Sequence, residues 1–534
     1  MRVSESNTAM NQKGFLGFVE RIGNGLPDPV FIFFYLILAL IGISVVCALV
    51  GVTAMHPTQT LADGSPLLLQ AQSLLSAENI QRLWTQMPAT FTHFHPLGYV
   101  LVVMLGAGVA ERSGLFASGI RQAVRNAPKG LLTPVVAIVA MLSNHAADAG
   151  YVVMIPLAAI IFAAAGRHPM AGIAAAFAGV SGGFSANISP GQLDALLFGI
   201  TEAAMDASQI DSGWSMNIAG NWYFISALLV IYLPVIWYVT DRVIEPRLGT
   251  WTPSGDQAAA FGDESAPLTD AERKGLRWAG FAIVGVCLLW ALMTFGPGTP
   301  LLNDGEGTDG QPWYVTATPF FRSLVAGFFV IFLAAGWAYG AAAGTIKTHR
   351  DLVAMMAEAM KDMGYYLVLA FAAAHFVAMF NWSNLGLITA VHGAGAIENS
   401  GLPLPIALGL IVLFAAFLNL FVGSASAKWA LLAPVLVPML LLLGISPEGA
   451  TATYRVGDAA TNIISPLMVY FPLVLIFAQR WQKDFGIGSL TAMMIPYSIW
   501  MLLTGVALVM LWILLGLPLG PGAPIGFDLG AIAN

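Results

Sequence analysis

Ionisable side chains are rare within the apolar stretches of this sequence, and each of them is a candidate for function. A charged group at the depth of a lipid bilayer is costly and is usually retained for binding or proton transfer. The ionisable residues in apolar surroundings are Asp148, Asp194, Lys428, Arg455 and Asp458, with His145 beside the first of them. The cations predict binding of an anion, and the carboxylates predict exchange of protons.

The three carboxylates are the candidates for proton coupling. Asp148, Asp194 and Asp458 would titrate as a cavity alternates between wet and dry surroundings, because these move a carboxyl pKa in opposite directions. Arg455 lies three residues before Asp458. This helical spacing allows an ion pair between them, and the alternative is that Arg455 clamps a substrate carboxylate.

The next two candidates follow each other in the sequence. Lys428 is either a residue that faces water or a second contact for an anion. Trp429 offers a flat aromatic face to a ring-bearing substrate, although a tryptophan at the membrane interface is equally common.

Four polar phrases interrupt apolar runs and are expected to form the binding site. They are SNHAADAG at 143–150, SANISP at 185–190, GSASAKW at 423–429 and TNIISP at 461–466. Unwound backbone at membrane depth is tolerated only where it is buried in protein or lines a wet cavity, so the four phrases should meet. The polar candidates are Ser143, Asn144, Ser185, Asn187, Ser189, Ser424, Ser426, Thr461, Asn462 and Ser465. The alternative is that small polar residues only join helices by hydrogen bonds.

The same phrases provide oxygen atoms for a cation and N–H groups for an anion. The ends of broken helices present free carbonyls or a positive dipole. A sodium ion could bind near Ser143, Asn144, Asn187 and Asn462, and no other cofactor is expected. The histidines lack the spacing of a zinc site, and the absence of any Gly-Lys pair excludes a Walker A loop. An ion gradient is therefore the expected source of energy.

The composition requires a membrane to surround these elements. Of the 534 residues, 57% are hydrophobic and only 10% are charged, too few charges to cover a soluble globule of this size. The two cysteines lie in apolar runs and form no framework. The formal net charge of -7, without a long basic run, gives no reason to expect a nucleic acid as partner. The sequence predicts an all-α polytopic membrane protein embedded in a lipid bilayer.

The distribution of lysine and arginine predicts the order of the segments. The result is about nine transmembrane helices plus two re-entrant hairpins, with broken helices at the midplane, a cytoplasmic N-terminus and a C-terminus on the opposite side of the membrane. A cytoplasmic N-terminus is predicted at 1–26 and a first repeat at 27–245, which contains a hairpin at about 131–165 and a broken helix at about 171–200. A cytoplasmic linker at 246–277 and scaffold helices at 278–343 follow. The second repeat is predicted at 344–486, with a hairpin at about 404–443 and a broken helix at about 450–480, and 487–534 forms the last helix and tail.

An internal duplication supports this division. The phrase GAGVAERSGL at 106–115 returns as GAGAIENSGL at 393–402 with seven of ten letters identical, and interrupted segments follow each copy. An odd number of crossings between the copies makes the repeats inverted. Inverted repeats with broken helices are typical of secondary transporters.

The long motifs SNHAADAGYVVMIPLAAI, GRHPMAGIAAAFAGVSGGFSAN, GSASAKWALLAPVLVPML and YRVGDAATNIISPLMVYF resemble those of the AbgT family of bacterial transporters. The resemblance covers essentially the whole chain. It implies a homodimer, nine spans with two hairpins per subunit, and p-aminobenzoyl-glutamate or sulfonamides as substrates. The family's functional positions fall on Asp194, Ser426, Trp429, Pro447, Arg455, Asp458, Asn462 and Pro466.

The resemblance does not decide which ion is coupled to transport or whether the substrate is imported or exported. His145 stands where the wider ion-transporter superfamily usually has threonine, which puts a sodium site at this tip in doubt. An aryl dicarboxylate would suit Arg455 and Trp429, and one site can serve import or efflux. Protons are favoured over sodium, and the alternative within the superfamily is a sodium-coupled carboxylate symporter.

Two readings from other classes are weaker. Gly179-Val180-Ser181-Gly182 spells the nucleophile phrase of rhomboid-like intramembrane serine proteases, with His375 or His392 as the required partner. Proteolysis leaves the duplication unexplained. A passive channel predicts flux without uphill accumulation, whereas the repeats favour alternating access.

Overall fold

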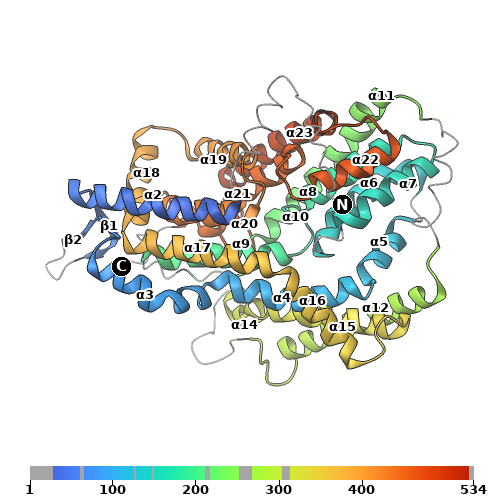
Figure 1. Cartoon of the computed structure of the whole chain (residues 1–534), viewed down its shortest axis with the longest axis horizontal. Helices are drawn as coiled ribbons and strands as arrows, with labels where there is room; N and C mark the ends of the chain where they lie inside the picture. The colour runs from blue at the N-terminus through green and yellow to red at the C-terminus, as the bar shows by residue number, and fades with distance from the viewer. Residues whose placement is uncertain are drawn as a thin grey trace, which may run out of the picture.

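The protein is an assembly of helices with one small β-hairpin at one end (Figure 1). The structure, a computed structural model, describes residues 28–60, 65–125, 128–146, 150–210, 214, 217–251, 267–302 and 313–527. The predicted N-terminal segment 1–26, much of the linker 246–277 and Asp148 lie outside the described residues.

The first half of the chain alternates long helices with short, irregular ones. Its elements are α2 (Pro29–Val50), β1 (Thr53–Thr60), β2 (Pro66–Gln70), α3 (Ala77–Thr92), α4 (His95–Arg112), α5 (Leu115–Arg125), η1 (Lys129–Leu131), α6 (Leu132–Leu142), η2 (Ser143–Ala146), η3 (Gly150–Met154), α7 (Ile155–Ala164), α8 (Pro169–Gly183), α9 (Gln192–Ser208), α10 (Trp222–Tyr238), η4 (Val239–Ile244) and α11 (Glu245–Leu248).

The second half has the same character. Its elements are α12 (Asp270–Phe295), α13 (Trp313–Thr316), α14 (Thr318–Arg322), α15 (Leu324–Ala343), α16 (His349–Asp362), α17 (Gly364–Trp382), α18 (Leu385–Asn399), α19 (Leu404–Asn419), α20 (Ala425–Leu442), α21 (Pro447–Thr461), η6 (Asn462–Ile464), α22 (Phe471–Trp481) and α23 (Ile487–Leu514). Along the long axis, α18 and the β-hairpin lie at one end and α6, α7 and α11 at the other (Figure 1).

The helical membrane class expected from the composition is confirmed. Among the described residues, eight helical stretches are long and apolar enough to cross a bilayer: α2, α3 with α4, α10 with its extension to Leu248, α12, α15, α17, α20 and α23. The expected broken helices at 171–200 and 450–480 each consist of two shorter helices, α8 with α9 and α21 with α22. The total of nine crossings and the two re-entrant hairpins stay predictions.

Two features differ from a simple set of spans. The predicted loop after the first helix contains the antiparallel pair β1–β2 and the helix α3, which apolar patterning at membrane length did not indicate. The segment from Lys361 to Ser400 is too long for one straight helix, so the sequence predicts a break near Asn381 to Asn384. This break is confirmed, because α17 ends at Trp382 and Asn384 has a left-handed backbone with φ 58°.

The helices α8 and α21 are the most deeply buried elements of the fold. Every residue of both is buried, and each begins with a proline at N1, where a missing N–H costs nothing. Glycines permit the close packing. A Cβ at Gly183 would lie 2.4 Å from the Met141 carbonyl of α6, and one at Gly457 would lie 2.5 Å from the Val412 carbonyl of α19. Each of the two helices therefore packs against the first helix of the predicted hairpin in its own repeat, α8 against α6 and α21 against α19.

Both copies of the repeated phrase end a helix in the same way. α4 stops before Gly114 and α18 stops before Gly401, with φ +92° and +67° at the two glycines. A glycine in the left-handed region is a common helix stop because it lacks a Cβ. The duplication is thus preserved in local structure as well as in letters.

Candidate functional site

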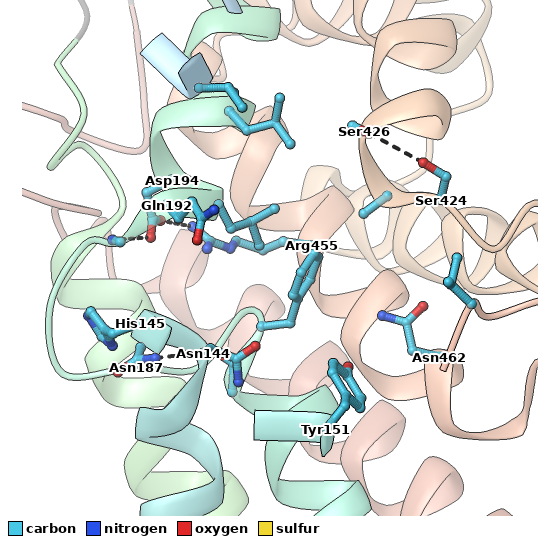
Figure 2. Close-up of a pocket in the computed structure, with 18 of the residues that line it drawn as sticks. Asn144, His145, Tyr151, Asn187, Gln192, Asp194, Ser424, Ser426, Arg455 and Asn462 are labelled. Atoms are coloured by element: carbon cyan, nitrogen blue, oxygen red, sulfur yellow. Dashed lines mark hydrogen bonds and ion pairs between the residues drawn. The ribbon is translucent and has the colours of Figure 1, made fainter. Parts of the chain in front are cut away.

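A cavity of about 340 Å³ lies between elements of the two halves. This volume is within the usual range for small-molecule sites. Figure 2 shows Asn144, His145 and Asn187 on one side and Ser424, Ser426 and Asn462 on the opposite side. All four polar phrases of the sequence therefore contribute to one cavity, as expected from the cost of unwound backbone in lipid.

An ion pair between the two halves forms part of the cavity wall. Nη1 of Arg455, on α21, donates to Oδ1 of Asp194, on α9, at 2.8 Å, and the two side chains are 2% and 8% exposed. Asp194 also accepts the backbone N–H of Gly191 through Oδ2 at 2.8 Å, which caps α9. Both carboxylate oxygens of Asp194 therefore have a hydrogen-bond donor within the protein.

The Arg455 guanidinium keeps donor capacity for a ligand. Its Nε is buried and has no hydrogen-bond partner among the described residues. An unsatisfied charged donor is costly, and a polar ligand or a water molecule beside it would relieve that cost. Arg455 is thus paired with Asp194 and not with Asp458, one helical turn away, which corrects the sequence-based alternative.

A second buried ion pair lies behind the cavity. Nζ of Lys428, on α20, contacts Oδ1 of Asp458 and Oδ1 of Asn419, while Nδ2 of Asn462 donates to Oδ2 of Asp458 at 3.0 Å. The side chains of Lys428 and Asp458 are 1% and 2% exposed. The pair is neutral overall, and both Asp458 carboxylate oxygens and the Asn419 amide oxygen have a donor, so the charges are compensated within the protein.

Asn419 connects this network and was missed by the sequence analysis. Its Nδ2 donates to the Asp458 carbonyl, to Thr461 Oγ1 and to Asn462 Oδ1 at 2.8 to 2.9 Å. Asn419 is the last residue of α19 and is fully buried. The sequence signal that could have indicated Asn419 is a single amide side chain at the end of an otherwise apolar helix.

The asparagines of the first half hold unwound backbone in place. Nδ2 of Asn144 donates to the carbonyls of Met141 and Val180 at 3.1 and 2.6 Å, and Nδ2 of Asn187 shares the Met141 carbonyl at 3.1 Å. The hydroxyl of Ser143 donates to Ala140. These contacts join the tip after α6 to the end of α8, and sodium binding here stays a prediction.

The facing wall presents the start of a helix. Ser424 caps α20 by accepting the Ala427 N–H at 3.3 Å, and Ser424 and Ser426 lie 3.2 Å apart. Both serines line the cavity. A helix N-terminus with free N–H groups favours a negative ligand.

Three predicted substrate contacts do not line the cavity: Trp429, Asp458 and Pro466. Trp429 is fully buried, stacks on Tyr454 with ring centroids 4.6 Å apart, and donates from Nε1 to Thr201 Oγ1 at 2.8 Å. Its large apolar ring and its single donor are both satisfied by this packing. We therefore place Trp429 in the core between α9, α20 and α21.

Two tyrosines supply the aromatic surface instead. Tyr151 and Tyr470 stack with ring centroids 4.5 Å apart and planes within 10°, and both line the cavity. They come from opposite halves of the chain. Sequence reasoning missed them because their juxtaposition depends on tertiary packing between η3 and the segment after η6.

The groups required for a serine protease are not together. Ser181 Oγ lies 3.3 Å from the Tyr151 hydroxyl. His375 instead contacts the Phe371 carbonyl and His392 the Thr53 carbonyl. Within the described ranges, no group of three or more His, Cys, Asp or Glu side chains is placed to hold a metal ion.

The fold and the cavity define a polytopic membrane protein with a central small-molecule site formed by interrupted helices. Comparison with known sequences gives a match to the "AbgT putative transporter family" over residues 14–527. The chain belongs to this family, and it is a transporter rather than an enzyme.

Individual relatives are similar over nearly their whole lengths. The chain is 37% identical to the p-aminobenzoyl-glutamate transport protein of Escherichia coli strain K12, over 96% of this chain and 97% of that one. It resembles the crystal structure of the Alcanivorax borkumensis YdaH transporter, with a TM-score of 0.83, 41% identity and coverage of 93% and 100%. It also resembles Neisseria gonorrhoeae MtrF, described with a class of antimetabolite efflux pumps, with a TM-score of 0.86, 40% identity and coverage of 96% and 100%.

The placement of Trp429 gives a prediction. Trp429→Phe should keep the stacking on Tyr454 and lose the hydrogen bond to Thr201, which costs about 1 kcal/mol of folding free energy. We expect a lower thermal midpoint in detergent and an unchanged substrate KM in proteoliposomes. An increased KM with an unchanged midpoint would show that the indole contacts the substrate.

Proposed function

We propose that this chain is a secondary active transporter of the bacterial inner membrane. It carries p-aminobenzoyl-glutamate, sulfonamide antimetabolites that share the aminophenyl group, or both, and a proton gradient drives it. The observation that carries the proposal is the Arg455–Asp194 pair in the wall of a cavity built from both halves. The names of the relatives support the substrate class.

The chemistry of the cavity fits an aryl carboxylate. The guanidinium of Arg455 and the N-terminus of α20 are donors for carboxylates, while the stacked Tyr151 and Tyr470 offer an aromatic surface for the ring. A sulfonamide shares the ring and presents sulfonyl oxygens to the same donors. Import and efflux can use this one site.

The ion pair also suggests how a proton is coupled to the substrate. Protonation of Asp194 removes the charge that holds Arg455 and leaves the guanidinium for a substrate carboxylate. Asp458 is a second candidate for proton coupling, with Lys428 as its counter-charge. Asp148 stays a third candidate for proton coupling, as proposed from the sequence.

The rival within the same class is a sodium-coupled carboxylate symporter. It would use oxygens near Ser143, Asn144, Asn187 and Asn462, which belong to interrupted helices in the structure. We favour protons because each half contributes a buried carboxylate paired with a cation from another element. We further propose a homodimer with a cytoplasmic N-terminus and a periplasmic C-terminus.

Counterflow of labelled p-aminobenzoyl-glutamate in proteoliposomes tests this function. We expect saturable exchange and uphill accumulation when a proton gradient is imposed, with no response to a sodium gradient. Unlabelled sulfonamide should compete for exchange. Accumulation driven by sodium alone would favour the rival, and non-saturable flux without accumulation would contradict a transporter with alternating access.

A further inference from the structure

Glu448 is a buried carboxylate outside the substrate cavity and outside both ion pairs. It lies in the first turn of α21 and is 2% exposed. Its two oxygens accept hydrogen bonds from the indole Nε1 of Trp214 at 3.2 and 3.0 Å, and no Lys, Arg or His of the described residues forms an ion pair with it. A buried carboxyl without a counter-charge is costly in its ionised form, which suggests that it is retained for function.

Two further cavities lie near Glu448: one is lined by Glu448 itself, and the other by Trp214, which donates to Glu448. A cavity of about 10 Å³ is lined by Glu448, Asp194 and Arg455, so it adjoins the ion pair of the substrate cavity. A larger cavity of about 460 Å³, which we call the outer cavity, shares Phe198, Asn217 and Ile218 with the small one and is also lined by Trp214. The indole of Trp214 therefore connects the outer cavity to the Glu448 carboxyl.

The small cavity has several polar side chains among its walls and has the size of a water site. Its volume is comparable with that required by about one water molecule. Two of the residues that line it, Asn221 and Arg455, have buried atoms, Oδ1 and Nε, without a hydrogen-bond partner among the described residues. An acceptor and a donor of this kind suit a water molecule between Glu448 and Asp194.

The outer cavity carries groups that exchange protons with solvent. Asp206 is 65% exposed at its side chain and contacts Nε2 of His95 at 3.0 Å, while Glu202 contacts Nδ1 of the same ring at 3.2 Å. The Tyr99 hydroxyl donates to Glu202 at 3.0 Å, and Arg322 completes the charged groups of this wall. The charge distribution of the sequence predicts that this side faces the periplasm.

We propose that Glu448 relays protons between the outer cavity and Asp194. The proposal rests on the proton-driven function proposed above. A proton from solvent in the outer cavity binds the Glu448 carboxylate. The O–H bond of Glu448 then breaks while an O–H bond forms on Asp194, with the water site as bridge, and the negative charge moves back to Glu448. Arg455 is thereby released from Asp194 and can bind the substrate anion.

The test compares two transport modes of one purified variant. Glu448→Gln keeps the size and polarity of the side chain and removes the proton. The proteoliposomes are first equilibrated at one pH on both sides, so that Asp194, which also lines the substrate cavity, reaches its protonation equilibrium without the relay. We then expect labelled p-aminobenzoyl-glutamate to undergo counterflow at the wild-type rate, because exchange without a gradient needs no net proton movement. Uptake driven by a proton gradient should fall by about 100-fold, as should the substrate-dependent pH change reported by a dye inside the vesicles.

Controls separate this relay from a structural role and from failure of the proposed function. Glu398→Gln makes the same change at an exposed residue of α18 and should leave both modes unchanged, whereas Glu448→Asp should restore part of the driven mode. Equal losses in counterflow and driven uptake would assign Glu448 to structure and overturn the relay. Wild-type coupling in Glu448→Gln would also overturn it, while a wild-type protein that ignores the proton gradient would refute the proton-driven function itself.

Discussion

Arg455→Ala is expected to abolish both substrate binding and concentrative transport. The change removes the guanidinium that lines the cavity and leaves Asp194, 8% exposed, without its cation. Losing the charged donor to a substrate carboxylate costs about 3 kcal/mol of binding free energy, equivalent to an affinity loss of about 100-fold. Binding of labelled p-aminobenzoyl-glutamate to purified protein and uptake in proteoliposomes measure the two effects.

Matched variants of the same pair separate binding from coupling. Asp194→Asn leaves Arg455 free, so it should bind the substrate at least as tightly as wild type while proton-driven accumulation is lost. Arg455→Lys keeps the charge but not the planar fork and should restore binding only in part. If Asp194→Asn lost binding to the same extent as Arg455→Ala, the carboxylate would be a substrate contact rather than a competitor for the guanidinium.

The second large effect is expected at the buried pair behind the cavity. Lys428→Met leaves the Asp458 carboxylate in the core with the Asn462 amide as a donor and no cation, which should destabilise the protein by about 3–5 kcal/mol. We expect a large fall in the thermal midpoint of the detergent-solubilised protein, measured by fluorescence-detected size exclusion. The yield from membranes should fall with it.

A double variant separates the contribution of this pair to folding stability from its contribution to proton-driven transport. Lys428→Met combined with Asp458→Asn removes both charges and keeps an amide beside Asn462, so the midpoint should recover. Proton-driven uptake should stay absent if Asp458 titrates during transport. A single Lys428→Met variant as stable as wild type would contradict the importance of this ion pair.

Much of the site could be predicted because its causes are local. Polar phrases such as SANISP and TNIISP interrupt apolar helices, and the cost of exposed backbone in lipid forces such segments together. Asn144, Asn187, Asp194, Ser424, Ser426, Arg455 and Asn462 accordingly line the cavity. The break at Asn384 could also be located, because the charges on either side required an interruption.

Pairing across the molecule could not be predicted from spacing. Arg455 and Asp458 are one helical turn apart, yet Arg455 pairs with Asp194 and Asp458 pairs with Lys428. The rotation of α21 between α9 and α20 decides these partners, and no local rule fixes that rotation. Trp429 was misplaced for the same reason, since only tertiary packing makes its ring a core element.

The two duplicated halves contribute different charged residues to the buried ion pairs. Each ends a helix at a left-handed glycine and each supplies an interrupted helix, but Lys428, Arg455 and Asp458 all belong to the later copy, which takes its remaining counter-ion, Asp194, from the earlier one. The two copies now form one shared binding site, so neither half expressed alone would retain a complete site for an anionic substrate.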